Sequence, residues 1–394
     1  VRTGLGGGRA PTCVAVLDVP GGAGAGRAQE RPEVLLGTQD ASVVVVSGPD
    51  EVEDQELNGT VLTEVLLLLS PSPSGAYLAA VDEGGALLVL PRALDGVAMR
   101  FATHQPSAPD QVAWMGNDCV ALAWQGRGVL LVCPTTDYQD LAVEGADLVL
   151  SSEPDGLRIL TPESLQSVQR VPAALHATRS PGTSAPPARL LRAYKRYSEG
   201  RAGSEAVLRA LEGAGELNRA VALLLQAAPE ERDAASQRQL LRAASFGLHA
   251  SSSPESDRFV AACRATRLLN RLRGAAAGLP LTAEQYSSLG ARALAHRLAQ
   301  RHQHRLALQL CEFLGLRSQR DDVLVHWARA TVTQGRGKRP TDDAALLRRM
   351  RRRLRNVGGV SFADIAAAAD AVGRRELATQ LLLAERRAER TVLL

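Results

Sequence analysis

The chain has 394 residues, of which 45% are hydrophobic, enough for two or three domains with cores of their own. Its 46 basic and 42 acidic residues leave a formal net charge of +4, a balance that does not indicate a nucleic-acid-binding protein. No signal peptide is recognisable at the start. The longest apolar run, at 61–69, contains Glu64 and is shorter than the about 20 residues of a membrane-spanning helix. Because the chain begins with Val1 instead of methionine, we expect a fragment.

The cysteines are scattered, form no CxxC pair and are odd in number. They are Cys13, Cys119, Cys133, Cys263 and Cys311. This distribution favours reduced, buried thiols of a cytosolic protein over a disulfide framework.

The first half of the chain has the pattern of β-hairpins. Four tight polar or glycine-rich turns, at 37–40, 82–85, 125–128 and 154–156, each lie between two apolar runs. The first three turns recur about every 43–45 residues, the length of one propeller blade. Residues 1–175 are therefore predicted to form a WD40-like β-propeller.

Two of these runs, at 43–46 and 120–123, are apolar on both faces. Such strands must be covered twice, as when propeller blades pack face to face. Only three or four blades fit before residue 175, so we expect an incomplete propeller; a generic β-sandwich is the alternative. The glycine-rich start, 1–28, has no strand before and no helix after its glycines, which favours a low-complexity segment over a dinucleotide-binding loop.

Residues 176–189 are rich in Ser, Pro and Thr and are predicted to be a linker. Beyond it the apolar residues take the period of helices. Three segments, at 215–228, 302–315 and 373–386, share an apolar pair followed by another pair four residues later. Their separations match about two helical hairpins each. We therefore predict an α-solenoid over 190–394, truncated at its C-terminal end.

His302, His304 and Cys311 lie within ten residues of one another, which raises the possibility of a metal site. On one helix, residues two apart point in opposite directions, so the two histidines could not share a zinc ion. Cys311 is better interpreted as a small hydrophobe at the edge of the apolar stripe, and the histidines as exposed or loop-lining. No GxSxG, HExxH, phosphate loop or EF-hand is present. We expect neither an enzyme nor a cofactor or metal.

The run at 346–356 is the most conspicuous charged feature. Leu347, Met350 and Leu354 share one face of a helix, which leaves its arginines to solvent. The arginines are Arg348, Arg349, Arg351, Arg352 and Arg353. They are candidate contacts for an anionic membrane or an acidic partner. A purely solvated face is the alternative, and the lack of aromatic residues nearby in the sequence disfavours RNA.

Several strings in the second half resemble the family of vacuolar protein sorting-associated protein 16, a class C core subunit of the HOPS and CORVET tethering complexes. They are QLLRAASFG (239–247), DRFVAACRATRLLNRLR (257–273), GLPLTAEQYSSL (278–289), RLALQLCEFLGL (305–316), HWA (326–328), GGVSFADIA (358–366) and GRRELATQLLLAE (373–385). EPDGLRIL (153–160) and VPAA (171–174) are similar to the end of the family's propeller. The resemblance is good from about residue 145 onward.

This resemblance implies a non-enzymatic scaffold of a complex that tethers endosomal and vacuolar or lysosomal membranes in vesicle-mediated protein transport. The implied partners are the other class C subunits and, through the complex, SNAREs and Rab GTPases. The family's site for the SM-family SNARE chaperone is expected to lie beyond this chain. The implied location is cytoplasmic, peripheral on late endosome and vacuole or lysosome membranes. A peripheral membrane or nucleic-acid binder acting through 346–356 is the alternative function.

Overall fold

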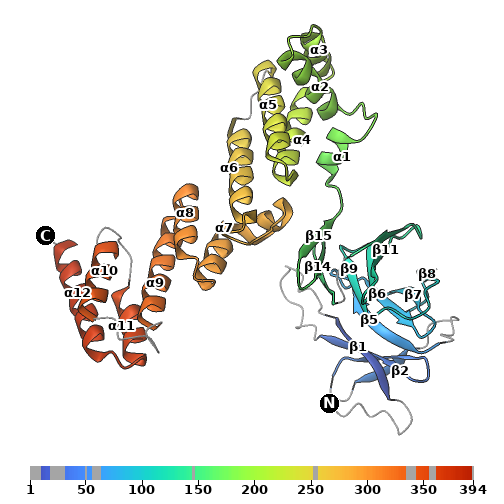
Figure 1. Cartoon of the computed structure of the whole chain (residues 1–394), viewed down its shortest axis with the longest axis horizontal. Coiled ribbons are helices and arrows are strands. Elements are labelled where there is room, and N and C mark those ends of the chain that lie inside the picture. Colours follow the sequence, from blue (N-terminus) through green and yellow to red (C-terminus); the bar gives the residue numbers. More distant parts are fainter. Residues whose placement is uncertain are drawn as a thin grey trace. The chain divides into compact units, whose positions relative to one another are not determined.

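The computed structural model describes residues 10–17, 32–48, 51–55, 64–143, 147–251, 256–333, 343–354 and 361–392. The chain divides into two compact units, Val1–Arg170 and Val171–Leu394. In the described residues the first unit contains strands and the second contains helices (Figure 1). Most of the predicted low-complexity segment 1–28 lies outside the described residues, but its part Pro11–Leu17 is a strand.

The strands of the first unit form four sheets, each a simple antiparallel meander. The first sheet holds β1 (Pro11–Leu17), β2 (Glu33–Thr38), β3 (Val43–Val46) and β4 (Val52–Gln55). The second holds β5 (Leu66–Pro71), β6 (Tyr77–Asp82), β7 (Ala86–Pro91) and β8 (Met99–Ala102). The third holds β9 (Gln111–Met115), β10 (Cys119–Trp124), β11 (Gly128–Val132) and β12 (Tyr138–Leu141). The fourth holds β13 (Val149–Glu153), β14 (Gly156–Leu160) and β15 (Leu165–Gln169).

These sheets are propeller blades. The first strands of successive blades contact one another, β1 with β5, β5 with β9 and β9 with β13, as strands around a propeller axis do. All four predicted turns join paired antiparallel strands: β2 to β3, β6 to β7, β10 to β11 and β13 to β14. The prediction of an incomplete β-propeller is confirmed.

Strand β10 is apolar on both faces because both of its faces are buried. Every residue of Cys119–Trp124 is buried. Val120 and Leu122 pack with residues of the second blade, whereas Ala121 and Ala123 pack with residues of the fourth. Because side chains alternate along a strand, one blade must supply an apolar face to each neighbour. Burying one Val or Leu side chain contributes about 1.5–3 kcal/mol.

The helices of the second unit follow in chain order. They are α1 (Ala173–Arg179), α2 (Pro186–Ser198), α3 (Ser204–Gly213), α4 (Leu217–Glu230), α5 (Ala234–Ala250), α6 (Ser256–Arg273), α7 (Ala283–Gln300), α8 (His304–Leu314), α9 (Arg317–Thr333), α10 (Asp343–Leu354), α11 (Phe362–Ala371) and α12 (Arg375–Val392). Neighbours pack as hairpins, most extensively α4 with α5 and α11 with α12. None of the described helices is long and apolar enough to cross a bilayer.

Most of the predicted linker 176–189 is helical in the structure. Helix α1 occupies its beginning and α2 its end, so only 180–185 lies between helices. Pro186 and Pro187 stand in the first turn of α2, where a missing backbone N–H costs no hydrogen bond and the fixed φ suits a helix. Proline content therefore predicted a linker where a helix begins.

The three related segments form α4, α8 and α12, and each contributes its apolar pairs to a different hydrophobic cluster of the helical unit. All four stripe residues of α4 are buried: Ala220, Val221, Leu224 and Leu225. In α12 the stripe is narrower, because Leu377, Ala378 and Leu381 are buried but Leu382 is 46% exposed. The prediction of an α-solenoid of hairpins is confirmed.

Helix boundaries follow local chemistry. Thr282 and Gln285 form a capping box at the start of α7, with Thr282 Oγ1 accepting from the Gln285 N–H at 3.0 Å. Ser361 caps α11, with its Oγ accepting a hydrogen bond from the Asp364 N–H. Gly315 ends α8 at φ 71°, a left-handed conformation that favours glycine. Within α7 the helical path breaks at Gly290, whose φ is 75°.

Candidate interaction surfaces

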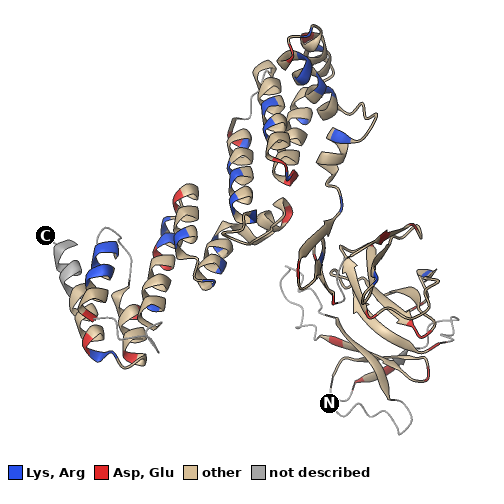
Figure 2. Cartoon of the chain, in the orientation of Figure 1, with Lys and Arg blue, Asp and Glu red and all other residues tan. Residues whose placement is uncertain are grey.

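The five candidate arginines all lie on the exposed face of α10. The opposite face carries Leu346, Leu347, Met350 and Leu354, which are buried in a core shared with α9, α11 and α12. In Figure 2 the blue segments of the α10 ribbon mark these basic residues. The amphipathic helix predicted from the sequence is thus present, and it displays positive charge outward.

Trp327 of α9 lies beneath this basic face. The guanidinium carbons of Arg349 and Arg353 lie 5.8 and 5.4 Å from the centre of its ring. A cation over an indole face is attracted by the ring quadrupole, with about 0.5–1 kcal/mol at exposed sites. Trp327 carries no local signal in the sequence, because it lies 19 positions before the run at 346–356 and only the packing of α9 against α10 brings them together.

Two further arginines of α10, Arg351 and Arg352, are exposed to solvent. Arg351 and Arg352 have no ion-pair partner among the described residues. Asp343, the acidic residue in the first turn of α10, is engaged by Arg374 at 3.2 Å and does not neutralise the arginine face. The face therefore presents a local positive charge that an anionic surface can approach.

The histidines at 302 and 304 do not point apart as the sequence analysis expected. Helix α8 begins only at His304, and His302 lies before it with φ 59°, so helical geometry does not relate the two. Their ring centres are 5.7 Å apart. His326 of α9 joins them, with its Nδ1 2.9 Å from His304 Nε2. This third imidazole from another helix was not expected either.

Two members of this histidine cluster (His302, His304 and His326) have a lowered pKa. Burial lowers the pKa of His304 and of His326, and the neighbouring histidines lower both further. A positive charge on either of these two rings would repel the other, which favours the neutral forms of His304 and His326. Among the described residues no group of His, Cys, Asp and Glu has the arrangement of a metal site. Cys311 is buried in the core of α7 to α9, as predicted.

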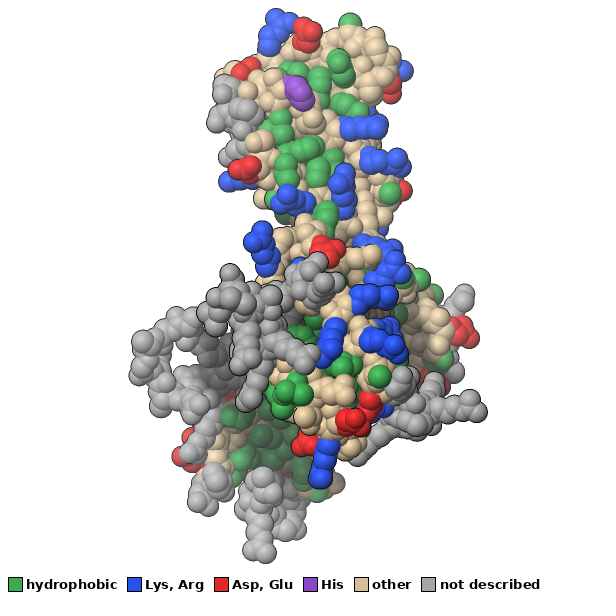
Figure 3. Space-filling view, turned by 90° about the vertical axis from the view of Figure 1, so that its left-hand side faces the viewer, with side chains coloured by type: hydrophobic (Ala, Val, Ile, Leu, Met, Phe, Trp, Pro, Cys, Tyr) green, Lys and Arg blue, Asp and Glu red, His purple; other side chains and the backbone are tan. Residues whose placement is uncertain are grey.

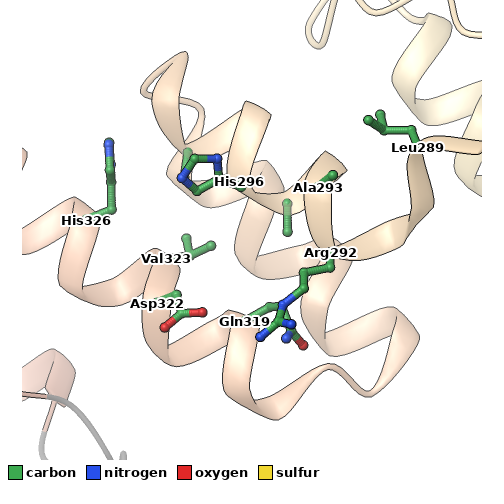
Figure 4. A pocket seen from close by; sticks show the side chains of 10 residues that line it. Leu289, Arg292, Ala293, His296, Gln319, Asp322, Val323 and His326 are labelled. Atoms are coloured by element: carbon green, nitrogen blue, oxygen red, sulfur yellow. The ribbon is translucent and has the colours of Figure 1, made fainter. Parts of the chain in front are cut away.

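A pocket of about 520 Å³ lies beside this cluster, between α7 and α9 (Figure 4). Its polar lining includes Arg292 and His296 of α7 and Gln319, Asp322 and His326 of α9. In the close view the Arg292 side chain extends toward Gln319 and Asp322, while the two histidines stand at the other end. The other half of its lining consists of alanine, leucine and valine side chains, as in a gap between stacked helices.

Comparison with known proteins decides the family. The model described as "Vps16, N-terminal region" matches residues 27–261, which run from the first blade into α6. The match covers more than half of the chain and includes the boundary between the two units. The chain belongs to the Vps16 family.

Named relatives agree with the Vps16 assignment. Protein VACUOLELESS1 of Arabidopsis thaliana is 32% identical over 343 residues, which are 87% of this chain and 39% of the relative. The vacuolar protein sorting-associated protein 16 homolog of Dictyostelium discoideum is 31% identical over 348 residues, 87% of this chain and 40% of the relative. This chain therefore spans about two fifths of the length of these Vps16 relatives.

Among solved structures, that of U3-55K matches with a TM-score of 0.31 and 16% identity, over 41% of this chain and 53% of that one. The RRP9 WD40 repeats match with a TM-score of 0.30 and 15% identity, over 41% and 52%.

Proposed function

We propose that this Vps16-family chain acts in vacuolar protein sorting as a non-enzymatic scaffold subunit of an endosomal or vacuolar tethering complex of the HOPS or CORVET type. Membership of the family supports this most directly, because several relatives carry vacuolar protein sorting in their names. In this function the chain makes and breaks no bond; it holds other proteins in place.

The fold supports a scaffold by its geometry. Hairpins that pack around successive hydrophobic clusters leave a row of exposed helix faces, and the blades leave exposed loops between strands. Each repeat contacts mainly its neighbours, so such a surface can take several partners without rearranging the core. The proposed partners are other class C subunits and, through the complex, SNAREs and Rab GTPases. The proposed location is the cytoplasmic side of late endosome and vacuole or lysosome membranes.

The test is association of the purified 394-residue chain with the other class C subunits, measured by co-elution in size-exclusion chromatography. We expect co-elution with at least one subunit at micromolar concentration. The absence of any association, under conditions in which a full-length relative associates, would contradict the proposal.

A second candidate function is contact of α10 with an anionic membrane or an acidic partner. It is favoured by the five exposed arginines and by the support that Trp327 gives two of them. An arginine at a phosphatidylserine surface contributes about 1 kcal/mol. Its test replaces all five by glutamine and measures sedimentation with phosphatidylserine vesicles.

The matched control removes the same charge from other exposed positions of the helical unit. These are Arg219, Arg242, Arg297, Arg305 and Arg317. If α10 is the contact, its variant loses vesicle binding and the control variant keeps it. Equal loss in both variants, or loss in neither, would exclude a specific role of α10.

A further inference from the structure

A second surface, separate from α10, lies between α6 and α8. Leu268 and Leu272 of α6 and Leu306 and Leu310 of α8 line a groove of about 240 Å³. Each pair is four residues apart, so each lies on one face of its helix. Both helices pack into the same core with α7. Leu268, Leu272 and Leu310 are buried members of this core and Leu306 is partly buried, so the groove lies over the outer edge of the core.

The groove continues outward over an exposed aromatic ring. Phe313, one turn after Leu310 on α8, lines the groove and is 42% exposed. The chain has only five phenylalanines, and a large apolar side chain at the rim of an apolar groove is typical of a docking site.

The other rim is positively charged. Arg267 and Arg271 of α6 line the groove, and Arg264 precedes them on the same helix face. All three are exposed and have no ion-pair partner among the described residues. The lining contains no Asp or Glu, and the nearby Glu312 lies 3.9 Å from Arg320. Figure 3 shows Lys and Arg side chains beside exposed apolar ones along a face of the helical unit.

Size and charge together restrict what the groove can hold. A volume of about 240 Å³ is below the ~300–1,000 Å³ of small-molecule pockets, but it accepts one or two apolar side chains. The distance from Leu306 to Phe313 is two helical turns, about 10 Å. An apolar floor of that length beside unpaired arginines is complementary to a helix with apolar residues at i and i+4 and carboxylates along its edge.

We propose that the α6–α8 groove binds an amphipathic helical segment of a partner protein, with Leu or Phe side chains in the groove and Asp or Glu side chains on Arg267 and Arg271. Phe313 packs against the apolar face of the segment. The use of this groove in complex assembly rests on the proposed scaffold function, but the groove can be tested without any complex.

The experiment uses the full chain and two fluorescent synthetic helical peptides. The peptides have leucines at the same i and i+4 positions, and differ in carrying either glutamates or lysines along the flank. We expect the glutamate peptide to bind with micromolar affinity in fluorescence anisotropy and the lysine peptide to bind at least about tenfold more weakly. We expect Phe313→Ala to weaken the binding of the glutamate peptide by about tenfold or more. Leu383→Ala, at an exposed leucine of α12, has no effect.

Charge reversal gives the sharpest readout. The double variant Arg267→Glu, Arg271→Glu should no longer bind the glutamate peptide and should bind the lysine peptide instead. Misfolding cannot produce such a switch, because a misfolded variant would bind neither peptide. Arg219→Glu, at an exposed arginine of α4, should leave the affinity for both peptides unchanged. Equal binding of the two peptides, or no switch in the double variant, overturns the proposed groove. Neither result bears on the scaffold function, which is tested separately by association with the class C subunits.

Two other occupants have distinct signatures. A concentration-dependent dimer in analytical ultracentrifugation that Phe313→Ala abolishes, with no peptide binding, would assign the groove to a second copy. Binding to phosphatidylserine vesicles that the double variant abolishes, again with no peptide binding, would assign it to a membrane surface. Either result overturns the proposed partner helix.

Discussion

At the scale of residues, the histidine cluster shows how a helix boundary decides chemistry. His302 precedes α8 and His304 begins it, so their rings converge on His326 where a continuous helix would separate them. Charged groups of the surrounding helices also face the cluster, namely His296 of α7 and Arg329 of α9. Both neighbours lower the pKa of His326 further.

This arrangement predicts that acid destabilises the helical unit. The folded-state pKa values of His304 and His326 lie below the ordinary value of 6.5, so between those values the unfolded chain binds more protons. The free energy of unfolding should therefore fall as pH drops through about 6.5, and level off once His304 and His326 are also protonated in the folded state. We expect His326→Gln to reduce the fall in Tm between pH 7.5 and 5.5.

The control for this prediction is His249→Gln, at an exposed histidine of α5 whose ring contacts only its own helix turn. It should leave the pH dependence of Tm unchanged. An identical pH dependence in wild type and His326→Gln would show that the cluster does not control acid stability.

At the scale of elements, one arginine holds three helices together. Arg273 ends α6, and its side chain donates hydrogen bonds to the carbonyl oxygens of Pro229 and Glu231, at the end of α4, and of Leu281, just before α7. Burial lowers its pKa to about 10, with Arg232 nearby adding to the effect. The guanidinium remains charged at neutral pH, and its planar fork matches several carbonyls at once.

Removing this side chain should destabilise the junction of α4, α6 and α7. We expect Arg273→Met to lower the free energy of unfolding by about 2 kcal/mol, because three carbonyls lose a charged donor. The measurement is urea unfolding followed by far-UV circular dichroism. Arg271→Met, two positions earlier on the same helix and exposed, should change it by less than about 0.5 kcal/mol. Equal effects of the two substitutions would refute the role given to Arg273.

At the scale of the whole molecule, the sequence predicted what depends on local chemistry and missed what depends on packing between distant segments. Turns, blade order and the stripes of α4 and α8 follow from hydrophobic period and turn residues, which act over a few positions. Trp327 beneath α10 and His326 beside His304 come from pairs of helices, and no local pattern marks such contacts. Leu382 is exposed because no neighbouring helix covers the end of that stripe among the described residues.

The central claim is that the helical unit works through its exposed faces. Hydrogen–deuterium exchange of the full chain, alone and with the other class C subunits, tests it most directly. The account predicts slower exchange on binding in contiguous stretches of the solenoid, with α6 and α8 among them, and little change in the buried strands β10 and β11. An exchange pattern that no subunit changes would contradict the claim, provided that the same subunits assemble with a full-length relative under the same conditions.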